Sequence, residues 1–153
     1  NPNTKVFAFD TEIHKTNLDA NDTVFTNATK LAKFGGGGTN CSLAGAHILL
    51  EDVPVDLLIM ISDNESWAGL NGRYGETGLM AHWLNIKRKN PKAKLVTLDL
   101  TPGQSTQVDT DRNDVLLVGG FSDKVFDVVK SFQEATGEDA FLKTIQEVSL
   151  MGA

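Results

Sequence analysis

The chain alternates between short apolar runs and longer stretches in which apolar residues recur at helical spacing. The apolar runs are rich in Val, Ile, Leu and Phe and are bounded by turn residues, which is typical of strands. Strands alternating with helices predict a doubly wound α/β fold, because each crossover between parallel strands needs a helix that covers one face of the sheet. We therefore expect a mostly parallel, Rossmann-like sheet with helices on both faces. The predicted strands are 5–10, 56–61, 94–100 and 115–118, and the predicted helices are 24–34, 43–51, 79–90, 122–135 and 140–150.

The strand predicted at 56–61 is the most apolar of the four. Its run of Leu, Ile and Met indicates a central parallel strand that is covered on both faces. It ends abruptly in the polar sequence Ser62-Asp63-Asn64-Glu65-Ser66. Ligands of open α/β sheets bind beyond the carboxyl ends of the strands, where loops converge on a rigid edge. The functional site is therefore predicted at this edge.

Hydroxyl, amide and carboxylate oxygens dominate the predicted site. Such hard ligands suit Mg²⁺ or Mn²⁺ and not a metal that prefers thiolates. Thr39 could approach the same edge from the loop before the next helix, where Thr39 and Ser42 are also candidate N-caps. Trp67 either covers the acidic loop or packs in the core. The spacing alone also fits an ordinary acidic loop after a strand.

Composition narrows the classes of function. At 153 residues the chain is long enough for one domain, and its net charge of −6 argues against a general platform for nucleic-acid phosphates. The single cysteine, Cys41, excludes an internal disulfide. The sequence contains no apolar run long enough to span a bilayer and does not begin with a signal peptide, so we expect a cytoplasmic protein without a membrane partner.

Two other motifs are incomplete. The glycine run 35–38 follows a helix and lacks the lysine of a phosphate-binding loop. The segment 109–114 begins like a calcium loop, but Asp114 replaces the required glycine and Gly120 replaces the bidentate glutamate. Neither is predicted to carry the function.

Four motifs, in this order, together indicate a known family. They are Val-Phe-Ala-Phe-Asp at 6–10, Gly-Gly-Thr-Asn-Cys-Ser-Leu at 37–43, Ser-Asp-Asn-Glu-Ser-Trp-Ala-Gly at 62–69 and Asp-Val-Leu-Leu-Val-Gly-Gly-Phe at 114–121. From about Val6 to Phe132 the chain resembles the C-terminal von Willebrand factor A-like domain of the Ro autoantigen family, ring-shaped RNA-binding proteins that carry a TROVE module.

The resemblance implies a metal-ion-dependent adhesion site (MIDAS) built from three loops. Thr39 matches the threonine of the second loop and Asp63 the aspartate of the third, whereas Ser62, Asn64, Glu65 and Trp67 would form the ligand-binding rim. The first loop, Asp-x-Ser-x-Ser after the initial strand, has no counterpart, because residues 10–14 align with the strand that follows the first helix. Residues 1–153 therefore resemble a von Willebrand factor A-like domain without its N-terminal strand, metal loop and helix.

The missing segment has two expected consequences. A sheet without its central strand exposes backbone donors, acceptors and apolar surface. Magnesium or another divalent cation is expected only if the missing Asp-x-Ser-x-Ser loop is supplied, because two side chains provide too few oxygens.

The leading functional hypothesis is a non-catalytic binding domain of a Ro-like ribonucleoprotein. Its expected partners are the missing N-terminal segment or the RNA-binding helical-repeat ring of the same protein, a small structured RNA bound through that ring, and a protein ligand at the metal edge. One alternative is a Mg²⁺-dependent hydrolase or phosphotransferase that uses Asp10 or Asp63, although no nucleophile–base pair is recognisable. Another is an extracellular adhesion domain. We expect no enzymatic activity.

Overall fold

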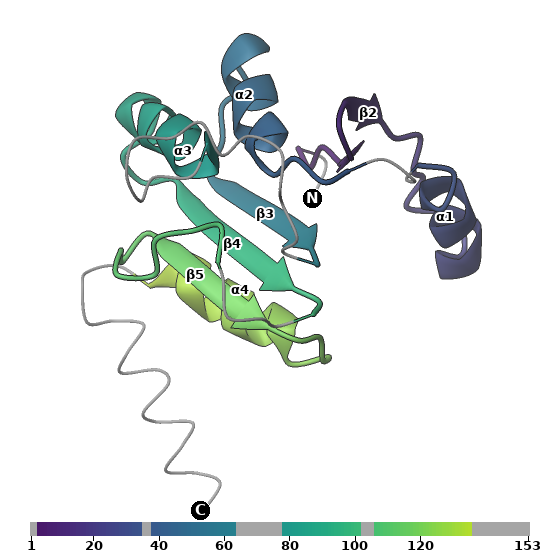
Figure 1. Cartoon of the computed structure of the whole chain (residues 1–153). Coiled ribbons are helices and arrows are strands. Elements are labelled where there is room, and N and C mark those ends of the chain that lie inside the picture. Colours follow the sequence, from purple (N-terminus) through teal and green to yellow (C-terminus); the bar gives the residue numbers. More distant parts are fainter. Residues whose placement is uncertain (1–2, 35–37, 64–77, 102–105, 136–153) are drawn as a thin grey trace, which may run out of the picture. The chain divides into compact units, whose positions relative to one another are not determined.

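The computed structural model describes residues 3–34, 38–63, 78–101 and 106–135 (Figure 1). They fall into two compact units, the first drawn from 1–54 and 65–89 and the second from 55–64 and 90–153. No helix in the described part of the chain is long and apolar enough to cross a membrane.

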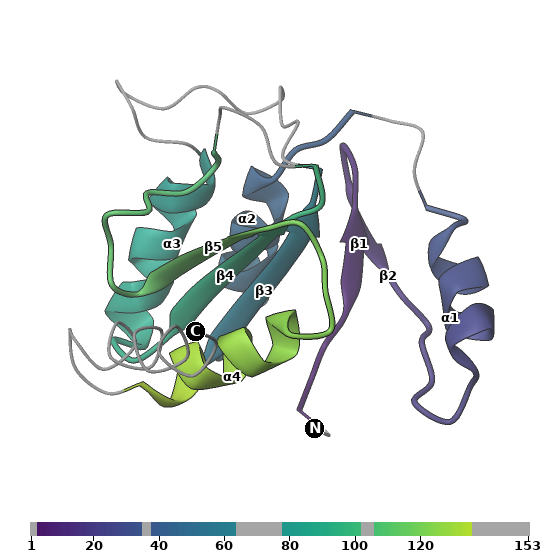
Figure 2. The same cartoon turned by 90° about the horizontal axis from the view of Figure 1, so that it is seen from below.

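The second unit is built on a three-stranded parallel sheet. Strands β3 (Leu57–Ser62), β4 (Lys94–Asp99) and β5 (Val115–Gly119) lie in the order β3-β4-β5. Helix α4 (Val125–Glu134) runs along one face of this sheet (Figure 2). These elements confirm the predicted α/β fold with parallel strands.

The core of this unit lies between α4 and the middle of the sheet. It contains two side chains of β4 and three of α4, and side chains of β3 and β5 pack around them. The end of α4 is fixed by Lys94, whose Nζ donates to the carbonyl oxygens of Phe132 and, at 2.7 Å, Ala135. The five buried residues are Val96, Leu98, Val125, Val129 and Phe132.

The prediction that the most apolar strand is central and covered on both faces is wrong for the described residues. Here β3 lies at the edge of its sheet and pairs only with β4. Ile59 is 44% exposed and Ile61 is 52% exposed. The central position belongs to β4, where every residue from Leu95 to Asp99 is buried. The expected exposure of apolar surface is thus present on β3.

The first unit contains a short hairpin and three helices. Strands β1 (Phe7–Phe9) and β2 (Ile13–Lys15) pair antiparallel, and α1 is Val24–Leu31. Helices α2 (Ser42–Leu50) and α3 (Gly78–Lys89) approach so closely that a Cβ at Gly45 would lie 2.6 Å from the Cβ of His82. A glycine is therefore needed at this crossing. Strand β2 was not predicted, because three residues are too few for an alternating pattern.

The helix predicted at 24–34 forms as the shorter α1, which ends at Leu31. Its N-cap is Thr23, whose hydroxyl accepts from the Thr26 amide at 3.1 Å. In α4, Phe126 is exposed and contacts Phe121. The helix predicted at 140–150 lies outside the described residues.

Candidate functional site

The acidic edge predicted from the sequence begins where β3 ends. Ser62 is the last residue of β3, and its Oγ donates to Oδ1 of the exposed Asp63 at 3.4 Å. The backbone amide of Leu100 donates to the Ser62 carbonyl at 2.9 Å, which continues the strand pairing to the very end of β3. The rigid sheet therefore fixes the backbone that presents Asp63.

Asp99 is a third polar residue at this edge, and the sequence reasoning did not single it out. It ends β4 directly opposite Ser62 and is only 6% exposed. Its Oδ1 accepts from the Thr101 amide at 3.1 Å. The sequence does show an aspartate at the end of a predicted strand. The strand register is needed to show that Asp99 lies beside Ser62 at the end of β3.

Thr39 lies in the first unit, in the loop that leads into α2. Its neighbour Asn40 donates its backbone N–H to the Asp10 carbonyl at 2.9 Å. The side-chain oxygen of Asn40 accepts from the Ser42 hydroxyl at 2.6 Å and from the Ser42 amide at 3.1 Å. The helix start is thus organised by Asn40 before the N-cap position Cys41, and the candidate caps Thr39 and Ser42 do not serve as N-caps.

Asp10 closes the turn of the hairpin. Its Oδ1 accepts from the Glu12 amide at 2.9 Å and lies 3.0 Å from His14 Nε2. The hydrogen bond from the Glu12 amide, reinforced by His14, holds the pKa of the Asp10 carboxyl below its ordinary value. The His14 ring in turn stacks on Phe34, with 5.2 Å between the ring centroids. The observed contacts of Asp10 are therefore those of a turn residue.

The oxygen ligands among the described residues are of the type that a hard cation prefers, but they are too few to hold one. Thr39, Ser62 and Asp63 offer oxygen ligands, whereas Mg²⁺ takes six ligands in a near-ideal octahedron. Within the described ranges, no group of three His, Cys, Asp or Glu side chains could hold a metal. Thr39 belongs to the first unit and Asp63 to the second, so their meeting at one cation remains a prediction. The rim residues Asn64, Glu65 and Trp67 lie outside the described residues.

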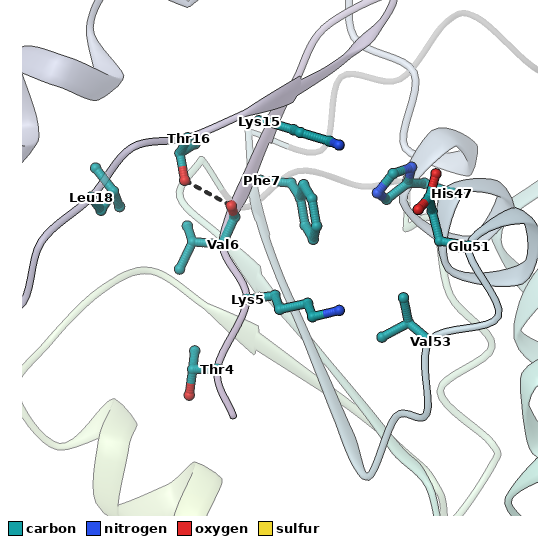
Figure 3. A pocket seen from close by; sticks show the side chains of 10 residues that line it. All are labelled: Thr4, Lys5, Val6, Phe7, Lys15, Thr16, Leu18, His47, Glu51 and Val53. Carbon is teal, nitrogen blue, oxygen red and sulfur yellow. Dashed lines mark hydrogen bonds between the residues drawn. The ribbon is translucent and has the colours of Figure 1, made fainter. Parts of the chain in front are cut away.

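A cavity of about 410 Å³ lies in the first unit, and Thr39 is not among its lining residues (Figure 3). It separates the hairpin from the C-terminal end of α2, and the side chains of Lys5 and Lys15 extend toward His47 and Glu51. Phe7 contacts the His47 ring edge-on, with 4.6 Å between centroids. The lining combines the basic Lys5 and Lys15, the acidic Glu51 and several apolar side chains. This mixture by itself does not indicate which class of ligand the cavity would bind.

In the segment 109–114, which begins like a calcium loop, the Asp114 carboxylate forms an ion pair with Arg112. Arg112 forms two hydrogen bonds to the buried Asp114 carboxylate, at 2.8 and 2.9 Å, and this hydrogen bonding raises the pKa of Arg112. The Asp114 carbonyl accepts from the Leu95 amide at 2.9 Å. This ion pair therefore anchors the entry into β5.

The chain is similar to proteins of one family over most of its length. Residues 1–133 match the family model of the Ro60 vWA domain. The chain is 26% identical over 137 residues to RNA-binding protein RO60 of Deinococcus radiodurans. The aligned region covers 90% of this chain and 24% of that protein. The crystal structure of the Deinococcus radiodurans RO (RSR) protein is similar in fold, with a TM-score of 0.64, 21% identity and coverage of 83% of this chain and 25% of that one. The chain thus spans about a quarter of the length of both relatives.

Proposed function

The chain belongs to the family of Ro60 von Willebrand factor A domains, and on this premise we propose that it is a non-catalytic binding domain of a Ro-like RNA-binding ribonucleoprotein. The similarity to RNA-binding protein RO60 supports this proposal. It does not favour the alternative, an extracellular adhesion domain. The use of Asp10 in a hairpin turn weighs against the hydrolase alternative. The proposed role is to present a cation-dependent edge to a ligand.

The observation that carries the proposal is the free edge of β3. Among the described strands, β3 pairs only with β4, so it lies at the edge of the sheet, where a further strand can be added. A parallel strand added there would end at the same edge as Ser62 and Asp63. An Asp-x-Ser-x-Ser loop following that strand would therefore arrive beside the acidic loop.

In the proposed complete domain, this loop supplies the missing oxygen ligands. Asp63 contributes negative charge, Thr39 a hydroxyl oxygen, and the added loop a carboxylate and two hydroxyls, which together suit Mg²⁺ or another divalent cation. The neighbouring rim, Ser62, Asn64, Glu65 and Trp67, would then contact a protein ligand. The domain's own residues hold the cation and perform no bond-breaking step.

RNA recognition is assigned to a helical-repeat ring elsewhere in the same protein, which would bind a small structured RNA. The net charge of −6 supports this division, since phosphate binding requires clustered cations. The chain alone should bind a structured RNA only weakly, and the affinity should fall steeply with salt. Tight binding that persists at high salt would move RNA recognition into this domain.

The metal proposal is tested by complementation. A segment from a family member that carries the strand and Asp-x-Ser-x-Ser loop is added to the chain, and Mg²⁺ binding is measured by calorimetry. Saturable binding is expected for the mixture and not for the chain alone. Asp63→Ala should weaken binding at least tenfold, whereas Asp111→Ala, which removes another exposed carboxylate, should leave it unchanged. Equal binding by the chain without the segment would contradict the proposal.

A further inference from the structure

The cavity in the first unit has two walls that carry different charges (Figure 3). Lys5 and Lys15 come from the hairpin, whereas His47 and Glu51 come from the C-terminal end of α2. Phe7 lies between the two lysines on the hairpin wall. None of the lining residues belongs to β3, so the cavity shares no residue with the edge of the proposed strand addition. The types of side chain leave the class of ligand open, but their placement on opposite walls narrows it.

The hairpin places both lysines on one side. Lys15 is the register partner of Phe7, and cross-strand partners point to the same face. Lys5 precedes Phe7 by two residues, and alternate residues of an extended chain share a face. The hydroxyl of Thr16 donates to the Val6 carbonyl at 2.7 Å, which holds the two chains together beyond the paired strands. Two ammonium groups therefore flank one aromatic ring on this wall.

The helix wall carries one carboxylate and one imidazole. His47 and Glu51 are four residues apart, so they lie on the same stripe of α2. The Glu51 amide donates to the His47 carbonyl at 3.0 Å, which holds Glu51 at the end of the helix. Asp52 then adopts a left-handed φ of 49°, and this turn brings Val53 to the cavity. The Glu51 carboxylate is thus held across the cavity from the lysines, near an apolar side chain.

The charges of the two walls do not neutralise each other. Within the described ranges, Lys5, Lys15 and Glu51 form no ion pair. Other lysines of the first unit do form such pairs, because Lys30 binds Asp22 at 2.6 Å. Hydrogen bonds that involve a charged group are stronger than neutral ones. The cavity can therefore bind a negative group on one wall and a positive group on the other.

This arrangement disfavours ligands whose charges all have one sign. A phosphate or a dicarboxylate would meet the two ammonium groups but also the Glu51 carboxylate, and a polyamine would be repelled by the two lysines. A zwitterion matches both walls, and an apolar part of it would contact Phe7 and Val53. The volume of about 410 Å³ is near the lower end of the range of small-molecule sites, roughly 300–1,000 Å³. The ligand is therefore small.

We propose that this cavity binds a free α-amino acid with an apolar side chain. Its carboxylate accepts hydrogen bonds from Lys5 and Lys15, its ammonium group donates to Glu51, and its side chain packs on Phe7 and Val53. A terminal residue of a peptide carries only one of the two charged groups, so a free amino acid fits better than a chain end. The proposal uses none of the predicted metal ligands and is independent of the proposed function.

The direct test is an NMR titration of the whole ¹⁵N-labelled chain with three probes. L-leucine carries both charged groups, 4-methylpentanoate lacks the ammonium group, and 3-methylbutylamine lacks the carboxylate. Leucine should shift amides 5–7, 15–16 and 47–53 in a saturable way, and the other two probes should bind at least tenfold more weakly. Equal affinity for the three probes, or no saturable shift of these amides with leucine, would overturn the proposal.

Two variants at exposed positions test the two walls separately. Lys15→Met should weaken leucine binding at least tenfold, because the carboxylate loses one ammonium partner. In Glu51→Gln, leucine and 4-methylpentanoate should bind equally, because the partner of the ligand's ammonium group is lost. The control is Lys33→Met, which removes an exposed lysine of the same unit that does not line the cavity and should leave binding unchanged. A preference for leucine that persists in Glu51→Gln, or equal losses in Lys33→Met and Lys15→Met, would contradict the site.

Discussion

Strands β3 and β4 are neighbours of equal length and parallel direction, yet water reaches them very differently. All but the first residue of β4 are buried, including the polar Thr97 and Asp99. In β3 only Met60 is buried, although five of its six residues are apolar. The more apolar strand is thus the more exposed one. Position in the sheet, and not hydrophobicity, decides burial here, and an exposed apolar strand indicates surface kept for a partner.

The largest expected effect comes from truncating one cross-strand pair. Leu98→Ala should lower the free energy of unfolding by about 3 kcal/mol, because it opens a cavity under α4. Ile61→Ala should cost only about 1 kcal/mol, because its side chain is half-exposed and loses less buried area. Urea denaturation measures both. Equal losses would show that β3 is as integral to the core as β4.

A smaller loss is expected at the start of β4. Lys94→Met removes the ammonium group that binds the last carbonyls of α4 and should lower the free energy of unfolding by about 1.5 kcal/mol. Lys92→Met is the control, since Lys92 is exposed two residues away on the same segment. A similar loss in both variants would assign the effect to overall charge and not to the end of α4.

The smallest effect, of opposite sign, is expected in the middle of β4. The Oγ1 of Thr97 is buried and has no hydrogen-bond partner among the described residues. Thr97→Val should therefore stabilise the fold by about 1 kcal/mol, because it removes a polar atom at constant shape. Thr97→Ser keeps the hydroxyl, loses a methyl and should destabilise by about 1 kcal/mol. Destabilisation by valine would indicate that the hydroxyl is satisfied in solution.

The sequence predicted the parts of the fold that local patterns determine. The strand runs at 56–61, 94–100 and 115–118 each produced a strand within one residue or so, and the helix predicted at 79–90 corresponds to α3, Gly78–Lys89. The family predicted from four short motifs is confirmed by the match over residues 1–133. Periodicity and ordered motifs are local properties, so they can be read without knowing the tertiary structure.

Properties that depend on pairing could not be read in this way. The edge position of β3 follows from which strands are present beside it, and the juxtaposition of Asp99 with Ser62 follows from strand register. The hairpin strand β2 forms because β1 pairs with it, and its three residues have no periodic signature. For the candidate site, Asp63 was correctly placed at a strand end, whereas its meeting with Thr39 remains a prediction.

The proposed function depends on a further strand that pairs with the edge of β3. Hydrogen exchange of the β3 amides, with and without the added strand and Asp-x-Ser-x-Ser segment, tests it most directly. Addition of the segment should slow exchange of the outward-facing β3 amides at least tenfold and leave β5, the opposite edge of the sheet, unchanged. If β3 exchange is unaffected, or if β5 is protected equally, the claim is contradicted.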